Sequence, residues 1–137
     1  MKIVLDANIF ISFFLTKKPT ITKIFNLWQE KKLQVLVSPE IRAEILKAFQ
    51  YPKIKKNLKP RDYQALNFLL EEETKLIIPR KRIIFCKDLD DNMYLECALE
   101  GKASFLITGD KKHLLPLKKF RQTEIISPAE FLKHLKV

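Results

Sequence analysis

The chain has 137 residues, 47% of them hydrophobic, which suffices for one compact domain with its own core but not for two. Its 26 lysines and arginines against 16 acids give a net charge of +10, which points to a polyanionic partner such as nucleic acid. No apolar stretch approaches the roughly 20 residues that span a membrane, and the N-terminus lacks signal-peptide order. We therefore expect a cytoplasmic protein without a membrane partner.

The predicted elements alternate along the chain between short β-branched runs and longer segments of helical period. Strands are expected over residues 3–5, 33–37, 76–78, 104–107 and 124–126. Helices are expected over residues 20–28, 39–49, 61–73, 91–100 and 128–135, and Gly101 is expected to stop the fourth of these. The stretch 51–60 reads as the loosest part of the chain.

The alternation of strands and helices, without hairpin signals such as Asn-Gly, predicts an α/β fold with a mostly parallel sheet of about five strands. Helices would cover both faces of this sheet. The only glycines, Gly101 and Gly109, exclude a glycine-rich phosphate loop. Cys86 and Cys97 do not form a C-x-x-C pair and stand among apolar residues, so we expect buried thiols rather than a redox or metal site.

Carboxylates follow the strands at one predicted edge of the sheet. Asp6 ends the first strand in "KIVLDANIFI", and Asp110 follows the fourth in "FLITGD". Because ligands bind outside the carboxyl ends of parallel strands, these two residues should share one rim. Glu44, about one and a half turns into the second predicted helix, lies near the same rim. The stretch "KDLDDN" adds Asp88, Asp90 and Asp91.

Such a concentration of carboxylates is costly without a cation, because the charges repel and raise one another's pKa. Oxygen ligands without histidine or cysteine suit Mg²⁺ or Mn²⁺ rather than zinc. Asp6 would then be a metal ligand on a rigid strand, and Asn8 would orient it or a bound water.

Each of these residues also has a local interpretation. Asp6 can be a helix N-cap, and Glu44 can be a solvated helix residue. At least one aspartate of "KDLDDN" should cap the helix that follows, since acids favour helix N-termini. The hydroxyls of Thr108 and Ser12 can support the carboxylates or satisfy nearby backbone groups.

Four stretches of the chain together resemble one known family: "VLDANIFIS", "LVSPEIRAEIL", "DLDDNMYLECALEGKASFLITGD" and "IISPAEFL". They are similar to the PIN-domain family, and specifically to its branch of VapC-like toxin components of toxin–antitoxin pairs. The resemblance extends in order over nearly the whole chain. It implies a single three-layer α/β/α domain over residues 1–137, with Mg²⁺ or Mn²⁺ in an acidic pocket. It also implies cleavage of single-stranded RNA, a cognate antitoxin protein as partner, and a homodimer as an option.

The resemblance also implies roles for individual residues. Asp6, Glu44, Asp91 and Asp110 match the four acidic positions of the family, and Asp88 matches an additional acid of this branch. His113 stands where relatives often carry an aspartate. We expect His113 and His134 to be structural or exposed rather than catalytic, because a metal site of this type needs no imidazole base.

The lysine runs read as solvated faces whose summed field suits an RNA backbone. The loose basic segment from Lys53 to Arg61 is a candidate contact for RNA. Its four candidate residues are Lys53, Lys55, Lys56 and Arg61.

The sequence thus favours a metal-dependent endoribonuclease that hydrolyses phosphodiester bonds of single-stranded RNA. Two alternatives remain. One is a PIN-like RNA-binding module that has lost catalysis. The other is a Mg²⁺-dependent phosphotransfer domain. One kind of such domain needs a second aspartate where Asn8 stands, and another needs a phosphoacceptor aspartate after the third strand. The chain has neither.

Overall fold

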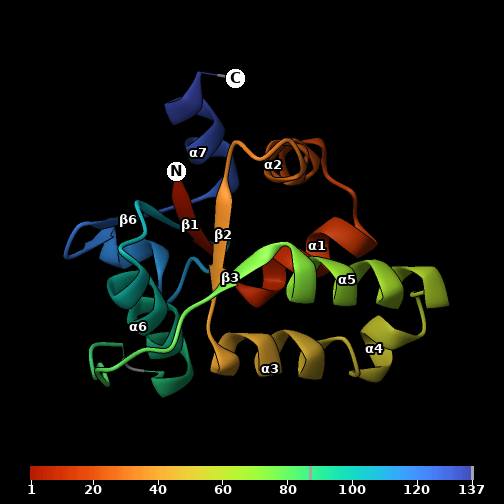
Figure 1. The fold of residues 1–137 in the computed structure, drawn as a ribbon, viewed down its shortest axis with the longest axis horizontal. Helices are drawn as coiled ribbons and strands as arrows, with labels where there is room; N and C mark the ends of the chain where they lie inside the picture. The colour runs from red at the N-terminus through yellow and green to blue at the C-terminus, as the bar shows by residue number, and fades with distance from the viewer. Residues whose placement is uncertain (87, 137) are drawn as a thin grey trace.

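A computed structural model describes residues 1–86 and 88–136 of the chain (Figure 1). Lys87 and Val137, which the predicted domain includes, lie outside the described residues. In the part that is described, no helix is both long and apolar enough to cross a membrane.

The centre of the fold is a six-stranded sheet in the order β3-β2-β1-β4-β6-β5. Neighbouring strands from β3 to β6 run parallel, and only β5 and β6 pair in antiparallel fashion. The mostly parallel sheet is confirmed. Four of the five predicted strands are present to within one residue of their expected bounds, and the strand expected over residues 76–78 lies two residues earlier, at Thr74–Leu76. The strands are β1 (Lys2–Leu5), β2 (Gln34–Val37), β3 (Thr74–Leu76), β4 (Phe105–Ile107), β5 (Lys119–Phe120) and β6 (Thr123–Ile126).

One further strand, β5, was not predicted from the sequence, and it forms a hairpin with β6. Lys119 pairs with Glu124 and Phe120 with Thr123, so only Arg121 and Gln122 form the turn. Arg121 adopts a φ of 55°, the left-handed conformation that two-residue hairpin turns require. The turn lacks the glycine or asparagine that usually marks a hairpin, and for this reason the β5–β6 pair was not predicted from the sequence.

Seven α-helices and two short 3₁₀ turns connect the strands in the described residues. The helices are α1 (Ala7–Leu15), α2 (Pro19–Gln29), α3 (Pro39–Ala48), α4 (Pro52–Lys55), α5 (Pro60–Glu72), α6 (Asn92–Gly101) and α7 (Pro128–Leu135), and the turns are η1 (Leu89–Asp91) and η2 (Leu115–Leu117). The five predicted helices agree with α2, α3, α5, α6 and α7 to within about two residues at each end. Helix α6 lies on one side of the sheet, and α1, α2 and α5 lie on the other (Figure 1).

Two helices were not predicted. Helix α1 is apolar over almost its whole length, so no polar face marks a helical period. Helix α4 occupies the stretch that reads as loose, where Pro52 takes the first helical position and favours a short helical turn.

Gly101 ends α6 as predicted, but for a different physical reason. The left-handed residue that closes the helix is Lys102, with a φ of 55°. A Cβ at Gly101 would lie 2.5 Å from Cδ1 of Leu36. Glycine is thus needed here because α6 packs closely on β2.

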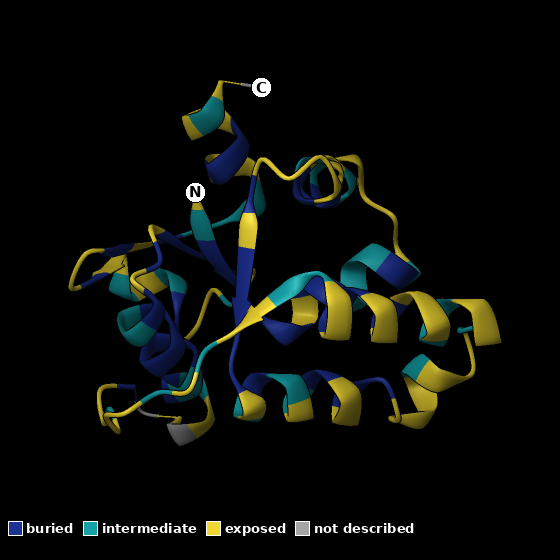
Figure 2. Ribbon diagram, viewed as in Figure 1, coloured by how far each residue is buried: buried dark blue, intermediate teal, exposed yellow. Residues whose placement is uncertain are grey.

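The core lies between the sheet and the two helical layers, and Figure 2 shows the central strands buried while the outer sides of α3 and α5 are exposed. On the side of α1 and α2, Phe10, Phe25 and Trp28 meet edge to face. Cys86 and Cys97 are buried free thiols, as expected. This rigid packing fixes the carboxyl ends of β1 and β4, which pair in parallel and point the same way.

Candidate metal centre

A cavity of about 280 Å³ lies at the carboxyl ends of β1 and β4. Walls from α1, α3, α4 and α6 surround it, and none of its described lining residues is a lysine or arginine. The cavity gathers every carboxylate that the sequence analysis singled out: Asp6, Glu44, Asp88, Asp90, Asp91 and Asp110.

Asp6 is both an N-cap and a member of this pocket. Its Oδ1 accepts a hydrogen bond from the backbone N–H of Ile9 at 3.2 Å, which caps α1, and its Oδ2 accepts one from the hydroxyl of Thr108. The residue is only 3% exposed. Burial raises the pKa of Asp6, and these hydrogen bonds oppose the rise without cancelling it.

Thr108 connects the first and last strand-end aspartates. Besides donating to Asp6, its Oγ1 accepts a hydrogen bond from the backbone N–H of Asp110 at 3.0 Å. Thr108 is completely buried, so this hydroxyl holds the chain after β4 against the chain after β1. Its expected supporting role therefore has a definite geometry.

Asp91 occupies the N-cap position of α6, but its side chain makes no capping hydrogen bond. Its Oδ2 is buried and has no hydrogen-bond partner among the described residues. Burial, followed by the charges of Asp110 and Asp88, raises the pKa of Asp91 to about 6. Asp88 instead serves the local turn, since its Oδ1 accepts from the backbone N–H of Asp90 at 3.0 Å. The capping of this turn thus falls to Asp88, and Asp91 is left free for another partner.

Asp110 organises the segment that follows β4. Its Oδ1 accepts hydrogen bonds from the backbone N–H groups of Lys112 at 3.0 Å and His113 at 3.1 Å. This turn brings Nδ1 of His113 to 3.5 Å from Oδ2 of Asp110 and 3.7 Å from Oδ2 of Asp91. His113, which was expected to be structural or exposed, thus lies beside two carboxylates of the pocket. The sequence signal that could have placed His113 here is its position three residues after Asp110. A turn capped by that aspartate brings the imidazole next to the Asp110 carboxylate.

The other predicted site residues divide into two groups. Asn8 is exposed and lines the pocket, but within the described residues its side chain makes no hydrogen bond to Asp6. Its backbone N–H, rather than its carboxamide, stabilises the Asp6 carboxylate. Ser12 does not line the pocket, and its carbonyl accepts from Thr16 within α1.

The candidate RNA contacts lie on α4 and at the start of α5. All four are exposed: Lys53, Lys55, Lys56 and Arg61. Tyr51 and Ile54, from the same short segment, form part of the pocket wall. The basic segment therefore borders the acidic pocket directly.

A row of acceptors on α6 was not predicted from the sequence. Oδ1 of Asn92 accepts from the backbone N–H groups of Phe85 at 3.1 Å and Cys86 at 2.8 Å. One turn later Oε2 of Glu96 accepts from Ile83 N–H at 2.8 Å, and a further turn on, Glu100 accepts from Arg80 N–H at 3.1 Å. The spacing of four residues, with polar side chains on a helix that is largely buried, was the available signal. The row fixes the segment that leads into Asp88.

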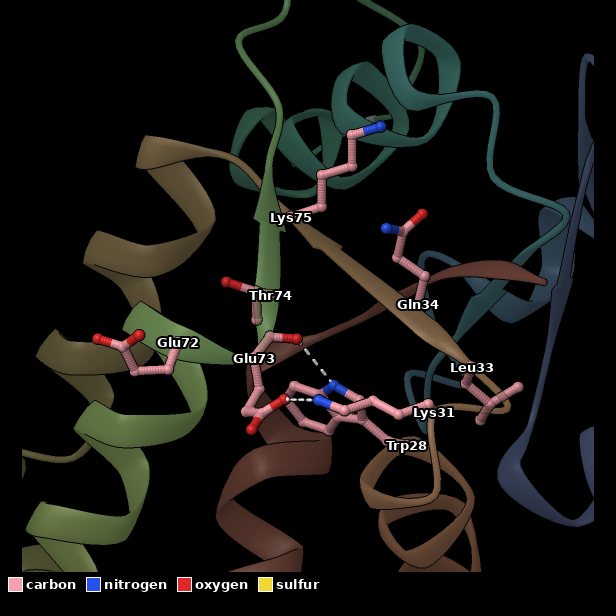
Figure 3. Close-up of a pocket in the computed structure, with 8 residues that line it drawn as sticks. All are labelled: Trp28, Lys31, Leu33, Gln34, Glu72, Glu73, Thr74 and Lys75. Atoms are coloured by element: carbon pink, nitrogen blue, oxygen red, sulfur yellow. Dashed lines mark hydrogen bonds and ion pairs between the residues drawn. The ribbon is translucent and has the colours of Figure 1, made fainter.

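A second cavity, of about 350 Å³, lies at the opposite end of the sheet, where β2 and β3 begin (Figure 3). There Lys31 pairs with Glu73 at 2.5 Å, and Nε1 of Trp28 donates to the carbonyl of Glu73 at 3.0 Å. Its central carboxylate is thus neutralised by a lysine. This cavity lies away from the carboxyl ends of the strands and has no comparable excess of charge.

The acidic pocket fits a divalent cation on its own evidence. Six carboxylates line it, and one of their oxygens, Oδ2 of Asp91, is buried without a hydrogen-bond partner in the described part of the chain. Carboxylate oxygens are the ligands that Mg²⁺ and Mn²⁺ prefer.

Comparison with known proteins identifies the family and the fold of the chain. Residues 2–112 match the family model described as PIN domain. An uncharacterised protein of Methanocaldococcus jannaschii is 34% identical over 113 residues, which cover 81% of this chain and 72% of that protein. The crystal structure of VapBC2 from Rickettsia felis, bound to a DNA fragment from their promoter, contains a chain of similar fold, with a TM-score of 0.61 and 14% identity over 93% of this chain and 98% of that one. The resemblance seen in the sequence is thereby confirmed at the level of family and fold, and this chain belongs to the PIN-domain family.

Proposed function

We propose that this protein is a metal-dependent endoribonuclease that hydrolyses phosphodiester bonds of single-stranded RNA. The observation that carries the proposal is the buried, unpartnered Oδ2 of Asp91 within a pocket of six carboxylates. A catalytically inactive RNA-binding module has no need to maintain that costly arrangement. The residues that would hold Mg²⁺ or Mn²⁺ are Asp6, Glu44, Asp88, Asp91 and Asp110.

The residues of the pocket divide the work between binding and positioning. When bound, a divalent ion supplies Lewis-acid chemistry, polarising the scissile phosphate and lowering the pKa of the attacking water. Thr108 keeps Asp6 and Asp110 at a fixed separation, and the row of acceptors on α6 fixes the approach to Asp88 and Asp91. In-line attack by water on the phosphorus then leaves a 5′-phosphate and a 3′-hydroxyl.

The substrate would approach along the basic segment. Lys53, Lys55 and Lys56 are exposed beside the pocket, and a net charge of +10 attracts the phosphate backbone. Tyr51 is 46% exposed and lines the pocket, so its ring offers a surface on which an unpaired base can stack. Stacking of this kind requires bases outside a duplex, which supports single-stranded RNA as the substrate.

We further infer that the protein is the toxin of a toxin–antitoxin pair, with a cognate antitoxin protein as partner and a homodimer as its assembly. The support is the motif resemblance together with the fold shared with VapBC2. Expression of the wild type should arrest growth, and Asp91→Asn should not. Co-expression of a gene that encodes the cognate antitoxin should restore growth to cells that express the wild type.

The nuclease proposal is tested by incubating the protein with a mixed single-stranded RNA pool and mapping the product ends. Cleavage should stop in EDTA, return with Mn²⁺ or Mg²⁺, and yield 5′-phosphate ends. Asp91→Asn serves as the control for contaminating nucleases. A 2′,3′-cyclic phosphate product, or full activity in EDTA, would overturn the mechanism.

A further inference from the structure

His113 is the one non-carboxylate member of the group of potential metal ligands that the described histidines, cysteines and acids form beside the pocket. One ligand atom each from Asp88, Asp91 and His113 lie within 4.8 Å of one another. The side chain of His113 is 41% exposed and lies beside the carboxylates of Asp91 and Asp110.

The distances around His113 suit a shared ion. Two atoms that bind one small divalent cation at about 2.1 Å each lie at most about 4.2 Å apart. Nδ1 of His113 lies 3.7 Å from Oδ2 of Asp91 and 3.5 Å from Oδ2 of Asp110, and both separations fall within that limit.

The partners of these atoms support the same assignment. Oδ2 of Asp91 is buried without a hydrogen-bond partner, so a bound cation would compensate for its lost hydration. Asp110 uses Oδ1 for the N–H groups of Lys112 and His113, which leaves Oδ2 turned towards the imidazole. The turn that orients Asp110 therefore orients His113 as well.

We propose that His113 is a nitrogen ligand of the ion held by Asp91, and that it shifts the preference of this centre from Mg²⁺ towards first-row transition ions such as Mn²⁺ and Co²⁺. This inference rests on the proposed metal site and adds the choice of ion. Imidazole nitrogen is a good ligand for transition ions, and Mg²⁺ takes oxygen almost exclusively. A centre with one nitrogen ligand and several carboxylate ligands should therefore bind transition ions more tightly than Mg²⁺, relative to a centre of carboxylates alone.

The alternative arrangement is an ion pair, in which a protonated His113 neutralises the carboxylates and competes with a metal. The two arrangements predict opposite effects of removing the imidazole. A ligand leaves a weaker transition-metal site behind, and a competing cation leaves a stronger site for every ion.

The test measures the affinities of Mg²⁺ and Co²⁺ by calorimetry for the wild type, His113→Ala and His113→Asn, without RNA. We expect the Kd for Co²⁺ to rise at least about tenfold in His113→Ala while the Kd for Mg²⁺ changes less than about threefold. His113→Asn places an oxygen near the position of Nδ1 and should keep the Mg²⁺ affinity of the wild type without restoring the affinity for Co²⁺. His134→Ala is the matched control, because His134 packs on Phe105, the first residue of β4, whereas the pocket lies beyond the carboxyl end of that strand.

A second readout is independent of any substitution. The chain has two histidines, so the imidazole NMR signals are readily assigned. Co²⁺ should shift or broaden the ring signals of His113 at one equivalent and leave those of His134 unchanged. Equal loss of Co²⁺ and Mg²⁺ affinity in His113→Ala, a gain for both ions, or unaffected His113 signals would overturn the proposal. In each of these cases the wild type still binds metal, whereas failure of the proposed function appears as a wild type that binds neither ion.

Discussion

The hydroxyl of Thr108 donates a hydrogen bond to Oδ2 of Asp6, across the paired ends of β4 and β1. The same oxygen accepts the backbone N–H of Asp110 at 3.0 Å. One buried side chain thus sets the positions of two aspartates that are more than one hundred residues apart in sequence. The geometry of the acidic pocket depends on a neutral residue.

Thr108→Val should preserve the shape of this site and remove its hydrogen bonds. Asp6 would lose a donor while remaining buried, so we expect a loss of about 1–3 kcal/mol in the free energy of unfolding. The pKa of Asp6 should rise further, and Mn²⁺ affinity should fall. Thr108→Ser keeps the hydroxyl and should retain most of the metal affinity. Denaturant unfolding and Mn²⁺ calorimetry check this, and equal behaviour of the two variants would contradict it.

The metal-free protein should lose stability as the pH rises through the titration of Asp91. The pKa of Asp91 is raised from 3.8 to about 6 in the folded protein, so between these values the folded state binds more protons than the unfolded state. Stability therefore falls from about pH 4 to about pH 6 and levels off above. Partial screening at the pocket mouth limits the effect to roughly 1–2 kcal/mol.

Asp91→Asn should remove this penalty. In EDTA at neutral pH its melting temperature should exceed that of the wild type by roughly 3–8 °C. Asp62→Asn is the matched control, because Asp62 caps α5 by accepting from Lys59 N–H at 2.8 Å, outside the pocket. Asp62 is the third residue of α5, and asparagine there keeps an oxygen that can accept the same N–H, so this variant should melt close to the wild type. Melting curves recorded from pH 4 to pH 8 separate the two.

Asn92→Leu should loosen the segment before Asp88. The substitution leaves the N–H groups of Phe85 and Cys86 without their acceptor, which costs about 1–3 kcal/mol for each one that stays buried. Hydrogen exchange of these two amides should accelerate, and Mn²⁺ affinity should fall because Asp88 and Asp91 lose their support. Glu100→Gln keeps an acceptor for Arg80 and is expected to change neither quantity. Slow exchange in Asn92→Leu would show that the segment is held by other contacts.

RNA affinity should depend steeply on salt, and the basic segment on α4 should account for part of this dependence. Each single-stranded phosphate contact contributes about 0.7 to the slope of log K against log[salt]. Replacing Lys53, Lys55 and Lys56 by alanine should therefore lower the slope by up to about 2. Binding is measured with an inactive Asp91→Asn background so that RNA stays intact.

A control triple removes the same charge elsewhere. Lys23 on α2, and Lys133 and Lys136 on and after α7, are exposed on two helices that pack together away from the pocket. Their replacement should leave the slope within about 0.5 of the wild type. If the two triples have equal effects, the basic segment is only a solvated surface.

The sequence sufficed for the parallel sheet because its strands are short β-branched runs separated by capped helices. Ser38 and Ser127 cap α3 and α7 as their Ser-Pro sequences predict. It did not suffice for α1, where Asn8 and Ser12 are the only polar residues, or for the β5–β6 turn, where Arg121 adopts a conformation usually left to glycine. In both cases tertiary packing, rather than a local pattern, determines the structure.

The same distinction applies to the pocket. The rule that ligands bind at the carboxyl ends of parallel strands placed Asp6 and Asp110 together, and the structure has them in one cavity. The rule is silent on side-chain direction. It could not tell that Asp88 would take the capping bond and leave Asp91 free, or that the turn at Asp110 would carry His113 back over the carboxylates.

The central claim is that the acidic pocket holds a divalent ion, and the melting temperature as a function of Mn²⁺ concentration tests it most directly. A ligand that binds only the folded state stabilises it by RT ln(1 + [L]/Kd). We predict that Mn²⁺ stabilises the wild type and Asp62→Asn by the same amount and that Asp91→Asn gains far less. Equal stabilisation of all three proteins by Mn²⁺ would contradict the account, even if the protein proves to cleave RNA.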